Sequence, residues 1–135
     1  MNALDYLHQR NIAHRDLKPE NVAINGYGYP VMIDFGCAAV LRGQTMTICG
    51  TPLYCAPVLT CKGHTTAVDC WSFGVMLYEL LSLEAPFKTG ADETIDDVYE
   101  NIIDGHYVLP EKLSPEASSL LTDLLQVRKY FIRLL

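Results

Sequence analysis

Residues 14–21, which read HRDLKPEN, are the stretch whose residue types and spacing indicate chemistry. Asp16 supplies a carboxylate that can accept or orient the proton of an attacking hydroxyl group. Asn21, further along the same stretch, supplies an amide oxygen that can hold a metal ion on nucleotide phosphates. The stretch fits the catalytic pattern H-R-D-L-x-x-x-N. Alone it is a hypothesis of phosphoryl transfer, which the rest of the chain has to support.

A second carboxylate follows at Asp34, in the DFG tripeptide of residues 34–36. Apolar residues alternate over 22–24 and again over 31–33, on either side of a glycine-containing turn, which predicts a small β-hairpin. A DFG tripeptide by itself would be an ordinary turn after a strand. Here the hairpin returns it to the neighbourhood of residues 14–21, so Asp34 is a candidate second oxygen ligand for Mg²⁺.

Residues 37–54 form a polar, irregular stretch without helical or strand periodicity. A long loop of this kind in a compact domain is usually functional, although an ordinary surface loop is the alternative. The stretch contains Thr47 and Thr51, and an Ala-Pro pair follows it at 56–57. Its position between the DFG tripeptide and this pair favours an activation loop.

Apolar residues at helical spacing predict four helices elsewhere in the chain. They are the end of an amphipathic helix over 3–7, a helix over 68–81 that is apolar on nearly every face, an amphipathic helix over 95–103, and a helix that starts with the Ser-Pro pair at 114. A helix that is apolar all round belongs at the centre of a domain. Gly105 ends the third helix. The sequence thus predicts a mainly α fold with a small β-hairpin.

Asp69, near the start of the helix over 68–81, has two compatible interpretations. It is the N-cap of that helix, or its carboxylate accepts hydrogen bonds from the backbone amides of another segment. The sequence leaves both open.

The composition limits the class of protein. With 135 residues, half of them hydrophobic, the chain can bury one sizeable core. A net charge of -6 and a pI near 5.0 argue against a dedicated binder of nucleic acid or of anionic membranes. Residues 1–5 lack the pattern of a secretory signal, and the apolar stretch 68–83 is interrupted by Asp69 and Glu79, as in a buried helix. No oligomeric state is indicated.

The five cysteines are odd in number and include no C-x-x-C pair. This usage argues against a disulfide framework and against a zinc site. We therefore expect a reduced, cytoplasmic chain.

Taken together, these residues resemble the catalytic domain of eukaryotic Ser/Thr protein kinases, and only its C-terminal lobe. The resemblance covers residues 2 to about 127, which implies a partial kinase domain over 1–127 and a divergent tail over 128–135. Lys18, two residues after Asp16, is typical of the Ser/Thr class. The segment 47–52 is similar to the activation segment of the cyclic-nucleotide-dependent branch. The segment 62–64, followed by 69–74, is similar to the cyclic-GMP-dependent kinases in particular.

The resemblance implies ATP and Mg²⁺ as cofactors and assigns the residues that would handle them. Asp16 would be the catalytic base, and Lys18 would neutralise the transferring phosphoryl group. Asn21 and Asp34 would hold Mg²⁺ with the nucleotide. Thr51 would line the substrate site and contact both Asp16 and Lys18.

The resemblance also implies regulation and substrate recognition. Thr47 would be the activating phosphosite with Arg15 as its partner, because a phosphate dianion and a guanidinium form strong bidentate bonds. Glu20 and Glu79 match positions that read basic residues near the acceptor of a protein substrate, although solvated carboxylates are the alternative for both. The remaining matches are structural. His14 and Phe35 would stack in a hydrophobic spine, and Asp69 would brace the backbone of the catalytic loop.

The sequence departs from the family in three places. It contains no glycine-rich loop, V-A-I-K-type lysine or partner glutamate of an N-terminal lobe, and it diverges after Val127, where the final helices would follow. The expected Ala-Pro-Glu reads Ala-Pro-Val at 56–58, and Arg133 is about one residue out of register with the arginine that pairs with that glutamate. We therefore expect little turnover from this chain alone. A non-catalytic interaction module and a partial fragment are the alternative hypotheses.

Overall fold

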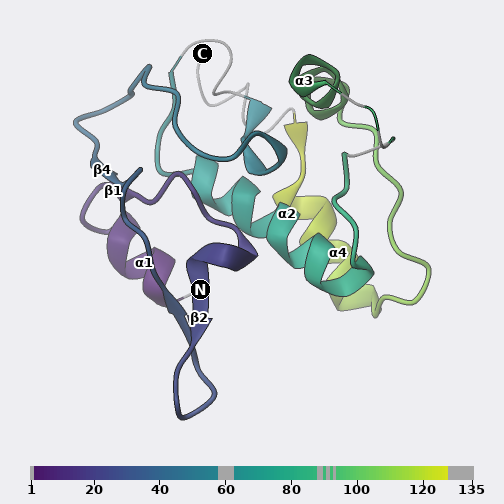
Figure 1. The fold of residues 1–135 in the computed structure, drawn as a ribbon, viewed down its shortest axis with the longest axis horizontal. Coiled ribbons are helices and arrows are strands. Elements are labelled where there is room, and N and C mark those ends of the chain that lie inside the picture. Colours follow the sequence, from purple (N-terminus) through teal and green to yellow (C-terminus); the bar gives the residue numbers. More distant parts are fainter. Residues whose placement is uncertain (1, 58–62, 88–89, 91, 93, 128–135) are drawn as a thin grey trace.

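The computed structural model describes residues 2–57, 63–87, 90, 92 and 94–127 (Figure 1). Its α-helices are α1 (Asn2–His8), α2 (Val68–Ser82), α3 (Ile95–Asp104) and α4 (Pro115–Leu124), with short 3-10 helices η1 (Pro19–Asn21) and η2 (Pro52–Tyr54). Its strands are β1 (Ile12–Ala13), β2 (Val22–Ile24), β3 (Pro30–Met32) and β4 (Ala39–Val40). The predicted mainly α composition with a small hairpin is confirmed for these residues. None of the helices in this described part is long and apolar enough to cross a membrane.

Helix α2 lies at the centre of the core, as its all-round apolar sequence predicts. Trp71 and Val75 are fully buried, and the Trp71 indole stacks on Phe87 with ring centroids 5.4 Å apart. The end of the helix departs from the prediction, since Leu80 and Leu81 are 61% and 46% exposed. The core therefore covers the first three turns of α2 and leaves part of the last one open.

The predicted hairpin is confirmed as the antiparallel pair β2–β3, with the second strand beginning one residue earlier than expected. Ala23 pairs with Val31 at its centre. The Asn25 side chain accepts hydrogen bonds from the backbone amides of Tyr27 and Tyr29 at 2.9 and 3.0 Å, which stabilises the turn. The hairpin projects away from the helices in Figure 1.

A second antiparallel pair, β1–β4, was not predicted. Strand β4 lies inside the stretch 37–54 that the sequence indicates as irregular, and η2 ends the same stretch. Strands of two residues are too short to produce an alternating pattern, which explains the miss. The pair continues in a hydrogen bond of 2.7 Å from the Leu41 amide to the Asn11 carbonyl, and it holds the start of the loop against the segment that precedes residue 14.

The ends of α3 and α4 follow their capping residues. Thr94 and Asp97 form a reciprocal capping box at the start of α3, and Gly105 ends the helix in the left-handed conformation, with φ 67°. The Ser114 side chain accepts a hydrogen bond of 3.2 Å from the Ala117 amide at the start of α4. These predicted boundaries are confirmed.

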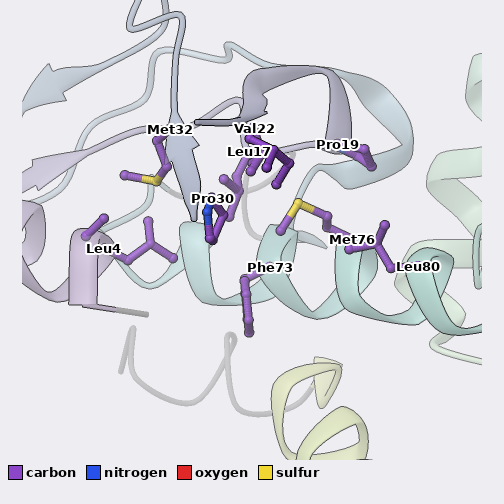
Figure 2. A pocket seen from close by; sticks show the side chains of 11 residues that line it. Leu4, Leu17, Pro19, Val22, Pro30, Met32, Phe73, Met76 and Leu80 are labelled. Carbon is purple, nitrogen blue, oxygen red and sulfur yellow. The ribbon is translucent and has the colours of Figure 1, made fainter. Parts of the chain in front are cut away.

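An apolar cavity of about 450 Å³ lies between α1, the β2–β3 hairpin and α2 (Figure 2). Apolar side chains from all three elements and from the segment 14–21 line it, among them Leu4, Leu17, Val22, Met32, Phe73 and Met76.

Candidate catalytic site

Asp69 organises the backbone of the segment 14–21. Its fully buried carboxylate accepts hydrogen bonds of 2.8 Å from the backbone amides of His14 and Arg15. The His8 ring lies 2.8 Å from the same carboxylate. Arg15 has a positive φ of 66°, a conformation that costs a non-glycine residue about 1–2 kcal/mol and that the two hydrogen bonds stabilise.

Of the two interpretations of Asp69, the structure supports contact with another segment. The N-cap position of α2 is Ala67, so the N-cap interpretation is wrong. Asp69 lies within the first turn, and its side chain points at the amides of residues 14 and 15. The contact to His8 was not predicted from the sequence, because nothing in the spacing of residues 61 positions apart indicates it.

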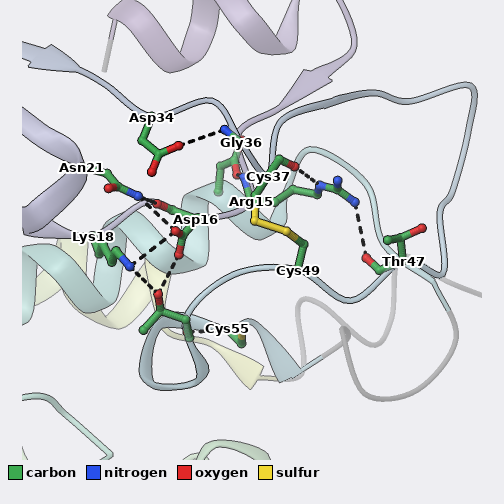
Figure 3. Close-up of a disulfide and its surroundings, with 12 residues drawn as sticks. Arg15, Asp16, Lys18, Asn21, Asp34, Gly36, Cys37, Thr47, Cys49 and Cys55 are labelled. Carbon is green, nitrogen blue, oxygen red and sulfur yellow. Dashed lines mark hydrogen bonds and ion pairs between the residues drawn. A yellow bond between two sulfur atoms is a disulfide. The ribbon is translucent and has the colours of Figure 1, made fainter.

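Three predicted side chains meet at Asp16 (Figure 3). The Thr51 hydroxyl donates to Asp16 Oδ1 at 2.8 Å, and Lys18 Nζ donates to the Thr51 hydroxyl oxygen at 2.7 Å. Lys18 Nζ also lies 3.4 Å from Asp16 Oδ2. The Asn21 amide nitrogen donates to the Asp16 backbone carbonyl at 2.7 Å and to its carboxylate at 3.1 Å. The cluster joins the segment 14–21 to the far end of the loop.

These contacts set the ionisation of Asp16. Partial burial raises its pKa, but the hydrogen bond from Thr51 and the positive charge of Lys18 lower it, and the net result is a pKa below the usual value for an aspartate. Asp16 is therefore an ionised carboxylate at neutral pH. Its oxygens are hydrogen-bond acceptors, as a group that receives or orients a hydroxyl proton must be.

Asn21 and Asp34 lie at the open end of the hairpin. The Ile33 amide donates to the Asn21 carbonyl at 2.9 Å, which sets the residue before Asp34 opposite Asn21. Asp34 Oδ1 accepts from the Gly36 amide at 3.0 Å, and Asp34 itself has a φ of 56°. The structure thus places the two candidate oxygen donors for Mg²⁺ at the same end of the hairpin.

The donor chemistry fits that ion. Because the Asn21 amide nitrogen is directed at Asp16, its side-chain oxygen is the atom left to face a cation. Among the described residues, no group of three His, Cys, Asp or Glu side chains forms a self-sufficient metal site. One or two protein oxygens that share the ion with substrate phosphates and water is the usual arrangement for Mg²⁺.

Arg15 connects both ends of the loop to the segment 14–21. Its Nε donates to the Cys37 carbonyl at 2.7 Å, and one terminal nitrogen donates to the Thr47 carbonyl at 3.3 Å. Thr47 is exposed. The pair that the resemblance predicts is therefore in contact through the Thr47 backbone, with the threonine side chain accessible from solvent.

A disulfide joins Cys37 and Cys49, so the expectation of a reduced chain without disulfides is wrong for this pair (Figure 3). The two Cα atoms are 5.9 Å apart across 12 positions of sequence. An odd cysteine count and the absence of C-x-x-C carry no information about such a contact, because the folding of the loop brings the two residues together. Cys61 lies outside the described residues.

Two further groups of predicted residues are the ring pair His14 and Phe35 and the acidic residues Glu20 and Glu79. His14 is fully buried and meets Phe35 edge to face with ring centroids 5.1 Å apart, although Phe35 is 48% exposed. The Tyr54 hydroxyl donates to Glu79 at 2.5 Å, and burial together with the charges of Glu79 and Glu20 raises the Tyr54 pKa. Tyr54 was missed by the sequence reasoning. Val58 and Arg133, the departures from the family pattern, lie outside the described residues.

Comparison with known proteins defines the class. Residues 1–130 match the description "Protein kinase domain". The chain is 44% identical over 115 residues to a cGMP-dependent protein kinase of Toxoplasma gondii, which covers 84% of this chain and 12% of that protein. It is 44% identical over 126 residues to the cAMP-dependent protein kinase catalytic subunit 3 of Drosophila melanogaster, which covers 93% of this chain and 21% of that protein.

The chain belongs to the protein kinase domain family. Within that family, these relatives are consistent with the cyclic-nucleotide-dependent branch, and a cGMP-dependent protein kinase of Eimeria tenella, 43% identical over 115 residues, adds to them. The predicted family is thus confirmed. The match covers 84% of this chain but only 12% of the length of the Toxoplasma gondii protein and 11% of the Eimeria tenella protein.

Proposed function

We propose that these residues are the C-terminal lobe of a Ser/Thr protein kinase that transfers a phosphoryl group from ATP to protein hydroxyls. The observation that carries the proposal is the cluster of Thr51, Lys18 and Asn21 around the Asp16 carboxylate. Such a cluster supplies a proton acceptor beside a cation, which phosphoryl transfer to a hydroxyl needs. The proposed domain covers residues 1–127 and leaves 128–135 as a tail.

The chain's own groups divide the work. Asp16 receives or orients the proton of the acceptor hydroxyl, and its lowered pKa keeps it ionised for that purpose. Lys18 places positive charge 3.4 Å from Asp16 and beside the Thr51 hydroxyl, where negative charge develops in the transition state. Asn21 and Asp34 would hold Mg²⁺ with ATP, which supplies the phosphoryl group when bound.

The proposed substrate is a protein segment with basic residues near its acceptor. Two observations support this proposal: the Glu79 carboxylate accepts a hydrogen bond from Tyr54, and Glu20 adds negative charge near the same tyrosine. We further propose phosphorylation of Thr47 as an activating step, since Arg15 already reaches that residue. A cytoplasmic location completes the proposal.

A kinase assay of the longest form of the protein that contains these residues tests the proposal, with Mg²⁺, ATP and a basic Ser/Thr peptide. Asp16→Asn should lower kcat by about 10²–10⁴-fold, the range of a general base, with KM for the peptide little changed. Asp104→Asn, an exposed aspartate at the end of α3, is the matched control and should leave kcat unchanged.

Two outcomes would contradict the catalytic role. One is full activity in Asp16→Asn. The other is a protein whose melting temperature does not rise with Mg²⁺ and ATP, and whose peptide binding is lost in Glu79→Gln yet unaffected by nucleotide. The second result would identify a non-catalytic peptide-binding module.

A further inference from the structure

We propose that Cys37 and Cys49 form a reversible redox latch, a disulfide that closes the loop 37–49 over Arg15 without requiring phosphate on Thr47. The closure of the loop does not depend on the proposed kinase activity. Its effect on the Asp16 cluster does rest on the proposed function.

The two cysteines stand at the two ends of the loop. Cys37 directly follows the turn 34–36 that carries the candidate metal ligand Asp34. Cys49 comes two residues before Thr51, whose hydroxyl donates to Asp16. The disulfide therefore links the metal-binding end of the candidate site to its substrate-facing end by one covalent bond.

Arg15 lies between these two ends and marks the surface that the latch closes. It donates to the Cys37 carbonyl on one side and to the Thr47 carbonyl on the other. Gly50, next to Cys49, packs against the Arg15 backbone so closely that a Cβ atom there would lie 2.3 Å from the Arg15 carbonyl oxygen. The disulfide thus holds the loop in the arrangement in which Arg15 contacts the backbone of Thr47, the residue proposed as the phosphosite.

Among the residues that the structure describes, few noncovalent contacts hold the middle of the loop, residues 42–49. Thr45 and His64 exchange two backbone hydrogen bonds, of 3.1 and 2.9 Å, in an isolated bridge. Residues 42–44 and 46–48 are exposed. Strand β4 and Thr51 keep their own contacts on either side of the loop without the disulfide. Residues 42–49 between them are then held by the Thr45–His64 bridge and the hydrogen bond from Arg15 to Thr47, so reduction should raise the population of open conformations of this stretch.

The chemistry is a two-electron exchange with a peroxide as oxidant. One thiol releases its proton, the thiolate attacks a peroxide oxygen, and the O–O bond breaks to give a sulfenic acid and hydroxide, which takes up the released proton as water. The second thiol then attacks the sulfenic sulfur, the S–S bond forms, and a second water leaves. Reduction needs two equivalents of a small thiol, which attacks the disulfide twice and ends as its own disulfide. Cys37 and Cys49 are both half-buried, so small reagents can reach them.

Cys55 is the natural control because it lies near the same loop and behaves differently. It is buried, it donates to the Thr51 carbonyl at 3.3 Å, and burial raises its pKa to about 11. A thiol of that kind is a poor nucleophile at neutral pH. Peroxide should therefore oxidise the pair 37 and 49 and leave Cys55 unmodified.

Limited trypsin digestion of the full chain, with Cys61→Ser to remove a thiol outside the described residues, tests the latch. Arg42 is exposed inside the loop, and Lys112 is an exposed site between α3 and α4 that serves as an internal reference. After peroxide treatment, cleavage at Arg42 relative to Lys112 should be about tenfold slower than in the thiol-reduced chain. The two halves should also stay joined until a reductant is added.

In both conditions, Cys37→Ser and Cys49→Ala should be cut at Arg42 as fast as the thiol-reduced parent chain. Cys55→Ser should behave as the parent chain does. Equal Arg42-to-Lys112 ratios in oxidised and reduced parent chain would overturn the proposal, as would failure to recover the linked Cys37–Cys49 peptide. An unfolded variant would reveal itself by faster cleavage at Lys112. A working latch in a protein that transfers no phosphate would refute the proposed function and leave this inference standing.

Discussion

Removal of the Asp69 carboxylate is the change whose effect on the free energy of unfolding follows most directly from the structure. In Asp69→Ala, the backbone amides of His14 and Arg15 lose their acceptor, and the His8 ring loses its partner. The substitution touches no atom of the Asp16 cluster. It therefore tests whether the Asp69 side chain alone holds the backbone of residues 14–21 on the side of the core.

The expected cost follows from the burial of those donors. A buried donor left without an acceptor costs about 1–3 kcal/mol, and the less buried Arg15 amide belongs at the lower end of that range. Release of a buried charge returns part of the loss, since a desolvated carboxylate is itself costly. We therefore expect the free energy of unfolding to fall by about 2–4 kcal/mol. Asp69→Asn keeps one acceptor oxygen and should recover at most about half of that loss.

The assay is urea unfolding of the reduced chain, followed by far-UV circular dichroism. With a slope of about 1.5 kcal/mol per molar urea, typical of a small domain, the midpoint of Asp69→Ala should fall by about 2 M. Asp104→Ala, which removes an exposed aspartate, should change the free energy of unfolding by less than about 0.5 kcal/mol. A loss in Asp69→Ala no larger than in this control would refute the proposed brace.

Three further predictions concern other elements. Thr51→Ala should raise the pKa of Asp16, measured by carboxyl NMR. A pKa that is lower in the folded than in the unfolded chain stabilises the fold above the unfolded pKa, and this stability is lost as pH falls through the folded pKa. The free energy of unfolding of Thr51→Ala should therefore fall less on acidification than that of the parent chain, and Thr51→Ser should restore the parent profile. Gly74→Ala places a Cβ 2.8 Å from a leucine of α4 and should lower the free energy of unfolding by about 1–3 kcal/mol, whereas Gly26→Ala, with open space around it, should not. Ser114→Ala should cost about 1 kcal/mol in thermal or urea unfolding, and Ser114→Asp should retain the cap.

The sequence predicts the elements whose signals are local. Helix α2 is apolar over enough consecutive turns to be recognised, and α3 is bounded by a capping box and by Gly105. The hairpin β2–β3 has alternating runs on both sides of its turn. In each case the deciding residues lie within one element, so their spacing alone carries the information.

Contacts between distant residues were predictable where the hairpin pattern or the buried position of Asp69 indicated them, and otherwise only where the family resemblance supplied them. Thr51 and Asp16 were expected to meet, and they do. The disulfide of Cys37 was missed, as was the contact of His8 with Asp69 across 61 positions. Such contacts depend on how the loop and helices pack, and no periodicity in the chain records them.

The segment 14–21 is thus held by two different kinds of interaction. On the side of the core, the fully buried Asp69 carboxylate accepts hydrogen bonds from its backbone amides. On the side of the loop, Arg15 and the disulfide hold the stretch that leads to Thr51, and a small oxidant or reductant can change the disulfide. Because the Thr51 hydroxyl is one of the donors that lower the pKa of Asp16, an opening of the loop that moves Thr51 would reach the proposed base by loss of that hydrogen bond. The combination of a buried carboxylate in the core and a chemically reversible disulfide in the loop allows the site to be regulated without loss of the fold.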